Sequence, residues 1–243
     1  MKLPIYCISD NHFSIIESEY ETIRRNKLFS LFKKIKKTGG TLIIGGDFFD
    51  FWFDYKNHHP NYNTLFLHLS ELDKEGVEIH YILGNHDYWD FGYFKNSFNC
   101  IVYNDDLSCI LPNGNKLLFT HGDGLLKSDT SYRFMKKIIR SKICIFLFNL
   151  LGEKVGYKIA QLISNTSAHY HHHDHKADKI ISEICSTMSK YNGHYKYILV
   201  GHYHQTGIFD IKGTKVIFMG DWLNKYTVTI YNGEKWVQKE WDK

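Results

Sequence analysis

Thr41 to Trp52, read TLIIGGDFFDFW, is the stretch that decides the fold. Its first four residues are aliphatic or β-branched, and a short run of this kind is typical of a strand buried on both faces of a sheet. Gly45 and Gly46 allow the backbone to turn sharply where this strand ends. Asp47 is thereby placed at the carboxyl end of a central strand, where open α/β sheets bind their ligands. A lone aspartate would more simply cap a turn, so its role depends on the other strand ends.

Four further segments with strand-like patterns also end in polar side chains. The five ends read Ser9-Asp10-Asn11-His12, Gly46-Asp47, Gly84-Asn85-His86-Asp87, His121-Gly122-Asp123 and Gly201-His202-Tyr203-His204. Each offers a carboxylate, amide or imidazole, and none offers a thiol. This mixture suits Mn²⁺, Fe or Zn²⁺ better than Ca²⁺, which prefers oxygen alone. Seven such side chains exceed the needs of one four-coordinate ion but match two ions that share a bridge, the arrangement that clamps a phosphoryl group.

Composition favours a folded enzyme. The chain has 243 residues, of which 43% are hydrophobic, enough to bury one large core. The net charge of +4 is too small to indicate a nucleic-acid partner, and none is expected. Five scattered cysteines without a C-x-x-C pair favour reduced thiols and a cytoplasmic location. The N-terminus lacks a signal-peptide pattern, and no apolar run approaches the ~20 residues that span a bilayer.

Predicted strands and helices alternate along the chain, which indicates the α/β class. In the first half we expect strands over 3–9, 41–45 and 77–83, and helices over 17–37 and 63–74. In the second half we expect short strands within 99–120, helices over 129–168 and 176–191, a strand over 197–200, and an antiparallel region made of 206–211, 215–219, 226–231 and 235–240. Without a repeat or an obvious linker, residues 1–243 are predicted to form a single domain with a helical insert over about 129–191.

The five strand-end motifs, in this order, resemble those of the calcineurin-like metallophosphoesterases. The resemblance implies a four-layer αββα sandwich with two divalent metal ions. One ion would be held by Asp10, His12, Asp47 and His204, and the other by Asp47, Asn85, His121 and His202. His86 would lie beside the pair, close to the phosphate or the leaving group, so that Asn85 and His86 are the candidate catalytic residues. Asp50, Asp87 and Asp123 are candidates to orient these ligands or simply to cap turns.

Narrower features are similar to the UDP-2,3-diacylglucosamine hydrolase branch of lipid A biosynthesis. They are Gly46 to Trp52, the run from His121 to Leu125 followed by Asp129 and Tyr132, and Gly220-Asp221-Trp222. This likeness implies cleavage of the pyrophosphate of UDP-2,3-diacylglucosamine to UMP and lipid X, with Mn²⁺ as cofactor and a helical insertion cap. It also implies substrate-binding positions at Asp129, Tyr132, Ser164 and Lys176. Many members have Arg where this chain has His86, a departure that concerns the substrate more than the reaction class.

The insert is also expected to meet a membrane. If 131–151 is one helix, Arg133, Lys137 and Arg140 share one face, and Phe134, Ile138 and Ile145 share the opposite one. Such a helix either packs on the sheet with its basic face in water, or caps the active site, takes up acyl chains and leans on the anionic inner leaflet. The second interpretation makes the protein peripheral on the cytoplasmic face of the inner membrane. The aromatic residues of 48–55 could likewise hold acyl chains or lie in the core.

Two other functions compete with this one. A metallophosphoesterase acting on another nucleotide or phosphodiester would need no apolar insert. A binding module on the same fold would be expected to have lost metal ligands, and all seven are present. The tract from His169 to His175 is expected to be a solvated loop, with metal binding or recruitment to the nucleotide site as alternatives.

Overall fold

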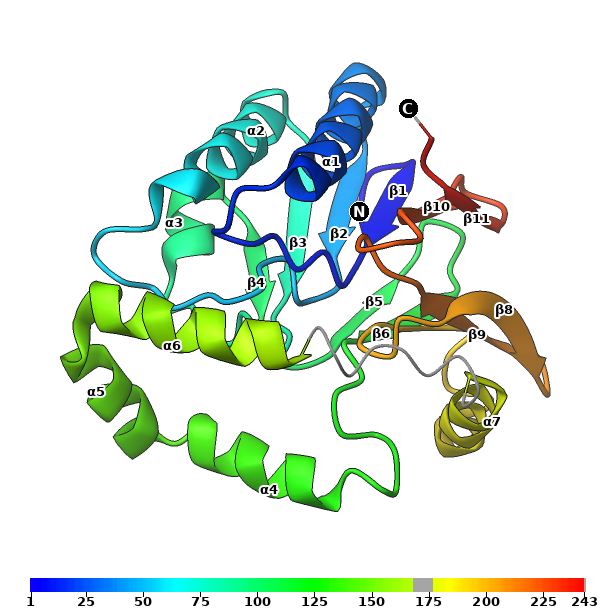
Figure 1. Ribbon diagram of the computed structural model, residues 1–243. Coiled ribbons are helices and arrows are strands. Elements are labelled where there is room, and N and C mark those ends of the chain that lie inside the picture. Colours follow the sequence, from blue (N-terminus) through cyan, green and yellow to red (C-terminus); the bar gives the residue numbers. More distant parts are fainter. Residues whose placement is uncertain (168–176, 243) are drawn as a thin grey trace.

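Two β-sheets packed face to face form the centre of the computed structural model, which describes residues 1–167 and 177–242 (Figure 1). The first sheet contains, in spatial order, β11 (Trp236–Glu240), β10 (Thr227–Tyr231), β1 (Ile5–Ile8), β2 (Thr41–Ile44), β3 (Glu78–Ile82) and β4 (Ile101–Tyr103). The second contains β5 (Leu107–Ile110), β6 (Lys116–Thr120), β7 (Tyr197–Val200), β9 (Thr214–Met219) and β8 (Thr206–Ile211). Strands β1 to β4 are mutually parallel, as are β6, β7 and β9.

Both faces of the first sheet are buried, as the continuous apolar strands predict. In β1, Ile5 and Cys7 face the core between the two sheets, whereas Tyr6 and Ile8 face the helical layer. This alternation follows from the two-residue period of a strand. Because every position of β1 and β2 is buried, these strands need no polar face.

Helices cover the outer faces of both sheets. The first sheet carries α1 (Glu19–Thr38), the short 3₁₀ turn η1 (Pro60–Tyr62), α2 (Asn63–Lys74) and α3 (Tyr93–Phe98). The second carries α7 (Ala177–Met188), which is followed by the 3₁₀ turn η3 (Ser189–Tyr191). The order helix, sheet, sheet, helix confirms the predicted four-layer αββα sandwich.

Three further helices follow β6 and lie together on one side of the sandwich (Figure 1). They are α4 (Thr130–Ile139), α5 (Lys142–Leu150) and α6 (Gly152–Ser167). The segment is mostly helical, as expected, but 131–151 is not one helix, because the chain breaks at Arg140 and Ser141. The Ser141 hydroxyl accepts the N–H of Cys144 at 3.2 Å and so caps a new helix.

The break changes which side chains of the insert face the core. Ile145, expected beside Phe134 and Ile138, packs against the core, whereas Phe134 and Ile138 are exposed. Among the aromatic residues of 48–55, only Phe51 is not fully packed into the core. That segment is therefore mostly structural, and its capacity to hold acyl chains is limited to Phe51.

The C-terminal strands pair antiparallel as expected, β8 with β9 and β10 with β11, but the two pairs lie in different sheets. Strands β8 and β9 join the second sheet, where β9 pairs in parallel with β7, and β10 and β11 join the first sheet through β1. The reason is long-range pairing: Ile5 lies opposite Tyr231. Helix α3 was not expected from the sequence.

Candidate metal centre

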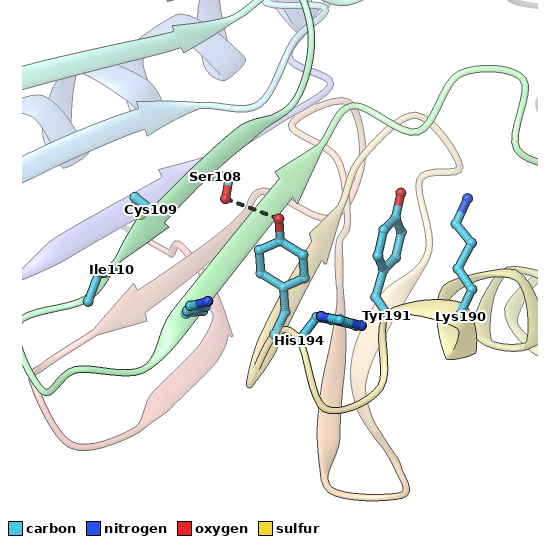
Figure 2. Close-up of a pocket in the computed structure, with 8 residues that line it drawn as sticks. Ser108, Cys109, Ile110, Lys190, Tyr191 and His194 are labelled. Carbon is cyan, nitrogen blue, oxygen red and sulfur yellow. Dashed lines mark hydrogen bonds between the residues drawn. The ribbon is translucent and has the colours of Figure 1, made fainter.

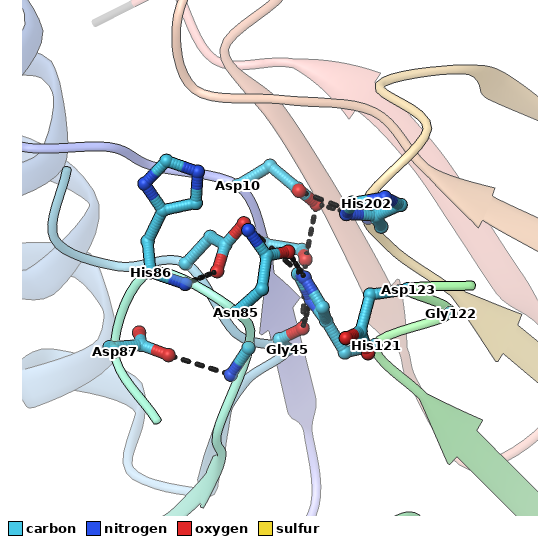
Figure 3. Close-up of polar contacts among 12 residues, drawn as sticks. Asp10, Gly45, Asn85, His86, Asp87, His121, Gly122, Asp123 and His202 are labelled. Atoms are coloured by element: carbon cyan, nitrogen blue, oxygen red, sulfur yellow. Dashed lines mark hydrogen bonds and ion pairs between the residues drawn. The ribbon is translucent and has the colours of Figure 1, made fainter. Parts of the chain in front are cut away.

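The predicted ligands all lie just beyond the carboxyl ends of strands. They are Asp10 and His12 after β1, Asp47 after β2, Asn85 after β3, His121 after β6, and His202 and His204 after β7. Because these strands are parallel within each sheet, their carboxyl ends share one edge. Figure 3 shows the side chains of Asp10, Asn85, His86, His121 and His202 converging there. The fold thus brings together residues that are up to 194 positions apart.

A first group consists of Asp10, His12 and His204, whose donor atoms lie within 4.8 Å of one another. The His204 Nε2 atom is 3.6 Å from Asp10 Oδ1, and the His12 and His204 rings stack with centroids 5.3 Å apart. His12 Nε2 is buried and has no hydrogen-bond partner among the described residues. A buried nitrogen without a partner is costly unless it binds something else, so this geometry fits a metal ion.

A second group consists of Asp47, His121 and His202, again within 4.8 Å. The His121 Nε2 atom is 3.3 Å from Asp47 Oδ2 and 3.2 Å from Asn85 Oδ1. The His121 and His202 rings are 5.3 Å apart. Carboxylate, amide and imidazole donors therefore face one small volume.

Asp47 lies between the two groups. Its Oδ2 atom, 3.3 Å from His121 Nε2, is also 3.8 Å from Nε2 of His12 in the first group. The residue is 1% exposed, so its carboxylate cannot satisfy its charge with bulk water. This is the position expected of a carboxylate that bridges two cations.

The backbone of these loops is strained at the ligand positions. The five non-glycine residues with φ between 47° and 63° in these loops are Asp10, His12, Asp47, His202 and His204. Left-handed conformations are uncommon for such residues and cluster at functional sites. Hydrogen bonds between loops hold them: the His12 N–H donates to the Asp47 carbonyl at 2.8 Å, and the Asp10 N–H to the Gly46 carbonyl at 3.0 Å.

Two glycines are required by the close approach of the loops. A Cβ atom on Gly46 would lie 2.4 Å from His121 Nδ1, and one on Gly84 would lie 2.2 Å from Asp47 Oδ1. Both distances are below van der Waals contact, so any side chain there would displace a candidate ligand. Glycine is therefore needed at these two positions to leave room for the candidate ligands, as well as to allow the turns.

Backbone carbonyls orient two of the imidazoles. His121 Nδ1 is 2.9 Å from the Gly45 carbonyl, and His86 Nδ1 is 2.6 Å from the Asp50 carbonyl. A carbonyl can only accept, so Nδ1 carries the proton in each ring and Nε2 faces the site. The backbone N–H of His86 donates to Asp47 Oδ1 at 2.8 Å.

The charges of the site call for cations. Burial raises the pKa of Asp10 to about 7, although His121 opposes the shift, and the nearby Asp47 carboxylate adds to it. Burial likewise lowers the pKa of His202 to about 4. For Asp47 the imidazoles of His121 and His86 outweigh burial and hold the pKa well below its usual value. Divalent cations among these donors would favour charged carboxylates and neutral imidazoles, so the residues present fit the two ions.

The aspartates expected to orient ligands have distinct structural roles. Asp87 accepts the N–H groups of Phe48 and Gly84 at 2.8 and 2.6 Å and thereby braces two ligand loops. Asp123 accepts the Tyr132 hydroxyl at 2.8 Å and pairs with Lys136 at 2.6 Å, which ties α4 to the site.

The expected substrate-binding residues are only partly placed. The Tyr132 ring lies 5.8 Å from that of His202, directly beside the site. Asp129 precedes α4, and its N–H donates to the Leu126 carbonyl. Ser164 lies on α6, and Lys176 and the tract 169–175 fall outside the described residues.

Asp221 is a neighbour of the site whose role the sequence did not indicate. Its Oδ2 atom is 3.9 Å from His204 Nδ1, on the side of the ring away from Asp10. Its Oδ1 atom accepts the N–H groups of Asn224 and Lys225. It lies in the Gly220-Asp221-Trp222 motif, and this motif was the sequence feature that could have indicated a residue of the site.

A cavity of about 720 Å³ lies at the opposite end of the second sheet. It is lined by residues of β5, the start of β6 and the segment 190–195, among them Lys116, Lys190 and His194 (Figure 2). The hydroxyls of Ser108 and Tyr195 are 3.1 Å apart across it. Lys116 begins β6 whereas His121 follows its end, so this cavity is separate from the candidate metal centre.

This chain is similar in sequence to known proteins over almost their whole length. The chain is 25% identical over 252 residues to the UDP-2,3-diacylglucosamine hydrolase of Porphyromonas gingivalis, covering 96% of this chain and 95% of that protein. It is 28% identical over 226 residues to the protein of the same name from Pseudomonas syringae pv. tomato, covering 90% and 88%. A third, from Haemophilus influenzae, is 26% identical over 225 residues, with 91% of each chain covered.

The family model for calcineurin-like phosphoesterases matches residues 3–206, a span that contains all of the strand-end motifs. The match covers well over half of the chain and agrees with the two packed sheets and the convergence of ligands at their edge. This chain therefore belongs to the calcineurin-like phosphoesterase family.

Proposed function

We propose that this protein hydrolyses the pyrophosphate bond of UDP-2,3-diacylglucosamine, giving UMP and 2,3-diacylglucosamine 1-phosphate. The observation that carries the proposal is the position of Asp47 between two groups of metal-ligating side chains. The choice of substrate is supported by the names of relatives whose similarity to this chain covers 88–95% of their own length. The reaction belongs to lipid A biosynthesis.

In this proposal Asp10, His12, Asp47 and His204 hold one divalent ion, and Asp47, Asn85, His121 and His202 hold the other. Mn²⁺ is the proposed metal, with Fe and Zn²⁺ as the alternatives that the donor set would also accept. Such a pair supplies positive charge to a phosphoryl group and makes water more acidic.

The residues beside the ligands orient the phosphate. Asn85 Oδ1 faces His121, so its amide NH₂ is the part that can donate to a phosphoryl oxygen. The His86 Nδ1–H donates to the Asp50 carbonyl, so Nε2 would donate to a phosphoryl oxygen in the imidazolium form. Burial disfavours that form, but the neighbouring Asp47 and Asp50 outweigh it and raise the pKa of His86. The sugar phosphate is a good leaving group, so His86 is assigned to bind phosphate rather than to protonate the leaving oxygen.

The helices α4 and α5 are proposed to receive the acyl chains and to contact the membrane. Their exposed apolar side chains include Phe134, Ile138, Ile143, Phe146 and Leu150. Helix α4 is tied to the metal centre through Tyr132 and Asp123, so this apolar surface adjoins the site. An apolar surface of several neighbouring side chains indicates a lipid or protein partner.

Two of the three basic side chains expected to face the membrane, Arg133 and Arg140, instead make contacts within the protein. Arg133 donates to the carbonyls of Gly124 and Leu126, and Arg140 lies 3.8 Å above the Tyr88 ring and pairs with Asp123. Lys137 has no such partner among the described residues. We therefore assign membrane contact mainly to apolar side chains. None of the described helices is long and apolar enough to cross a bilayer, and we propose peripheral attachment at the cytoplasmic face of the inner membrane.

The second candidate is hydrolysis of a soluble nucleotide or phosphodiester, which the same metal centre could perform. Purified protein is incubated with Mn²⁺ and either UDP-2,3-diacylglucosamine or UDP-N-acetylglucosamine, and UMP release is measured in ¹⁸O-labelled water. We expect UMP from the diacylated substrate alone, with the label in UMP because water attacks the α-phosphorus. UMP release from both substrates at similar kcat/KM would support the second candidate. No UMP from either, with a soluble phosphodiester cleaved, would reject the first.

A further inference from the structure

We infer that Arg24 of α1 is a positioning residue that shapes one metal position, the one formed by Asp10, His12 and His204, and not the other. This inference rests on the proposed metal centre. Arg24 is 2% exposed and lies on a different structural layer from the ligands, yet its guanidinium reaches the loop after β1.

The guanidinium holds the backbone of the ligand loop directly. Its Nη2 donates to the carbonyls of Asn11 and His12, the latter at 3.2 Å. Nη1 pairs with Glu21 at 2.7 Å, and this carboxylate is itself 4% exposed. Contacts from both terminal nitrogens, one to a carboxylate and one to two carbonyls, fix the direction of the buried guanidinium. Asp10 and His12 have left-handed backbones, which persist only where the surroundings hold them.

The same side chain also reaches the loop that supports His204. Arg24 Nε donates a hydrogen bond to the Trp222 carbonyl at 3.1 Å. The Trp222 indole N–H donates one to the Arg24 carbonyl at 3.0 Å. The Trp222 backbone N–H donates to the Asp10 carbonyl at 3.1 Å. Asp221, the residue before Trp222, faces His204 Nδ1 at 3.9 Å. All three residues of the first group are thus connected to Arg24 through one or two contacts.

The second position is connected to Arg24 less directly, through the His12 N–H that donates to the Asp47 carbonyl and through the Asp10 carboxylate that accepts the His202 N–H. Among the described residues, Arg24 makes no hydrogen bond to Asn85, His121 or His202, and His121 is oriented by the Gly45 carbonyl instead. Loss of Arg24 should therefore act on one ion, although both ions share Asp47.

Arg25 provides a matched control. It follows Arg24 on α1, pairs with the same Glu21 at 2.8 Å, and donates to two loop carbonyls, those of Ser14 and Asn61. Neither carbonyl belongs to Asp10, Asn11 or His12, although Ser14 follows them in the same loop. Arg25→Lys therefore removes a comparable set of contacts without touching Asp10, His12 or Trp222.

The test is equilibrium binding of Mn²⁺, followed by electron paramagnetic resonance of bound ions. We expect Arg24→Lys to weaken one of the two Mn²⁺ sites by about 10–100-fold, the usual effect of a partner that orients ligands. The spin-coupled signal of a Mn²⁺ pair should give way to that of a single ion. Arg25→Lys should bind two ions as the unmodified protein does.

Single-site backgrounds identify the affected position. In His202→Ala, which retains the first group, adding Arg24→Lys should weaken binding of the remaining Mn²⁺ by about the same 10–100-fold. In His204→Ala, which retains the second group, it should change the affinity less than about twofold. Equal loss in both backgrounds, or an equal loss in Arg25→Lys, would show a merely structural role and overturn the inference. Normal binding of two ions by Arg24→Lys would also overturn the inference.

If Arg24→Lys does not fold, the double variant Arg24→Gln/Glu21→Gln takes its place. The expected results and the contradicting results are then the same. Failure of the unmodified protein to bind two ions would instead remove the proposed metal centre and the inference with it.

Discussion

Asp47 has the most demanding environment of the residues at the site. It is buried, adopts a left-handed backbone, and faces His12 and His121 from the same carboxylate oxygen. The Asp47→Asn variant keeps the shape of the side chain but removes the charge that would hold two cations together. We expect loss of at least one metal ion and of nearly all turnover, with the fold retained. Elemental analysis and far-UV circular dichroism measure this, and two bound ions with a near-normal rate would exclude a bridging role.

His86 is expected to contribute through its contact with phosphate. The His86→Ala variant should lower kcat by a factor on the order of 10²–10³, the usual effect of losing one donor to developing charge. Its metal content should not change, because His86 lies outside both proposed ligand sets. His86→Arg should keep substantial activity, since Arg also binds phosphate. If His86→Arg loads both metals but is as inactive as His86→Ala, proton donation becomes the better assignment.

At the residue scale, the sequence predicted which side chains converge but not what holds them. Strand ends followed by Asp, Asn or His form a visible pattern, and in parallel strands those ends must meet. The contacts of Arg24 with Trp222 and of Asp221 with His204 could not be predicted. They join positions far apart in the chain, and the residue types involved do not by themselves indicate such a contact.

At the scale of elements, the α5 helix buries some of its apolar side chains and exposes others. Phe148 packs against Phe51, Phe53 and Trp89, with ring centroids 4.8–5.8 Å apart, whereas Phe146 is 61% exposed. We expect Phe148→Asp to lower the free energy of unfolding by about 0.5–3 kcal/mol, because it buries a charge among aromatic rings.

Phe146→Asp should leave that free energy nearly unchanged but raise KM for the diacylated substrate. Hydrolysis of a small soluble phosphodiester should be unaffected. The comparison uses thermal unfolding together with the kinetics of both substrates. Equal losses of activity on both substrates in Phe146→Asp would show that α5 serves the structure only.

The break between α4 and α5 shows why the insert was only partly predictable. The apolar positions of 131–151 fit one helical period, and the Ser141 cap that interrupts it was not recognised as a helix start. Consequently the face assigned to Ile145 was wrong. The short helix α3, six residues long, was missed because it is too short to show a period.

At the scale of the whole molecule, the order of helical and sheet layers could be predicted more readily than which strands share a sheet. Continuous apolar strands and amphipathic helices indicate sheets covered on both sides. Which strands share a sheet depends on pairings such as that of Ile5 with Tyr231, which leave no local pattern in the sequence. For this reason β8 to β11 were expected together but are divided between two sheets.

The proposed membrane attachment would also be a property of the whole surface. We expect binding to anionic vesicles to fall when Phe134 and Phe146 are both replaced by Ser, since each buried methylene is worth ~0.8 kcal/mol at a lipid surface. Lys137→Gln should weaken the binding by about 1 kcal/mol, and this part alone should depend on salt. Co-sedimentation at two salt concentrations measures both effects. Vesicle binding that is unchanged in the Phe134 and Phe146 double variant would exclude the α4–α5 surface.

The most direct test of the metal centre is anomalous X-ray diffraction from crystals of the protein loaded with Mn²⁺. The account predicts two anomalous peaks, one on each side of Asp47 and roughly 3.5–4 Å apart, the spacing of ions that act on one phosphoryl group. One peak should be surrounded by Asp10, His12 and His204, and the other by Asn85, His121 and His202. A single peak, or peaks away from Asp47, would contradict it.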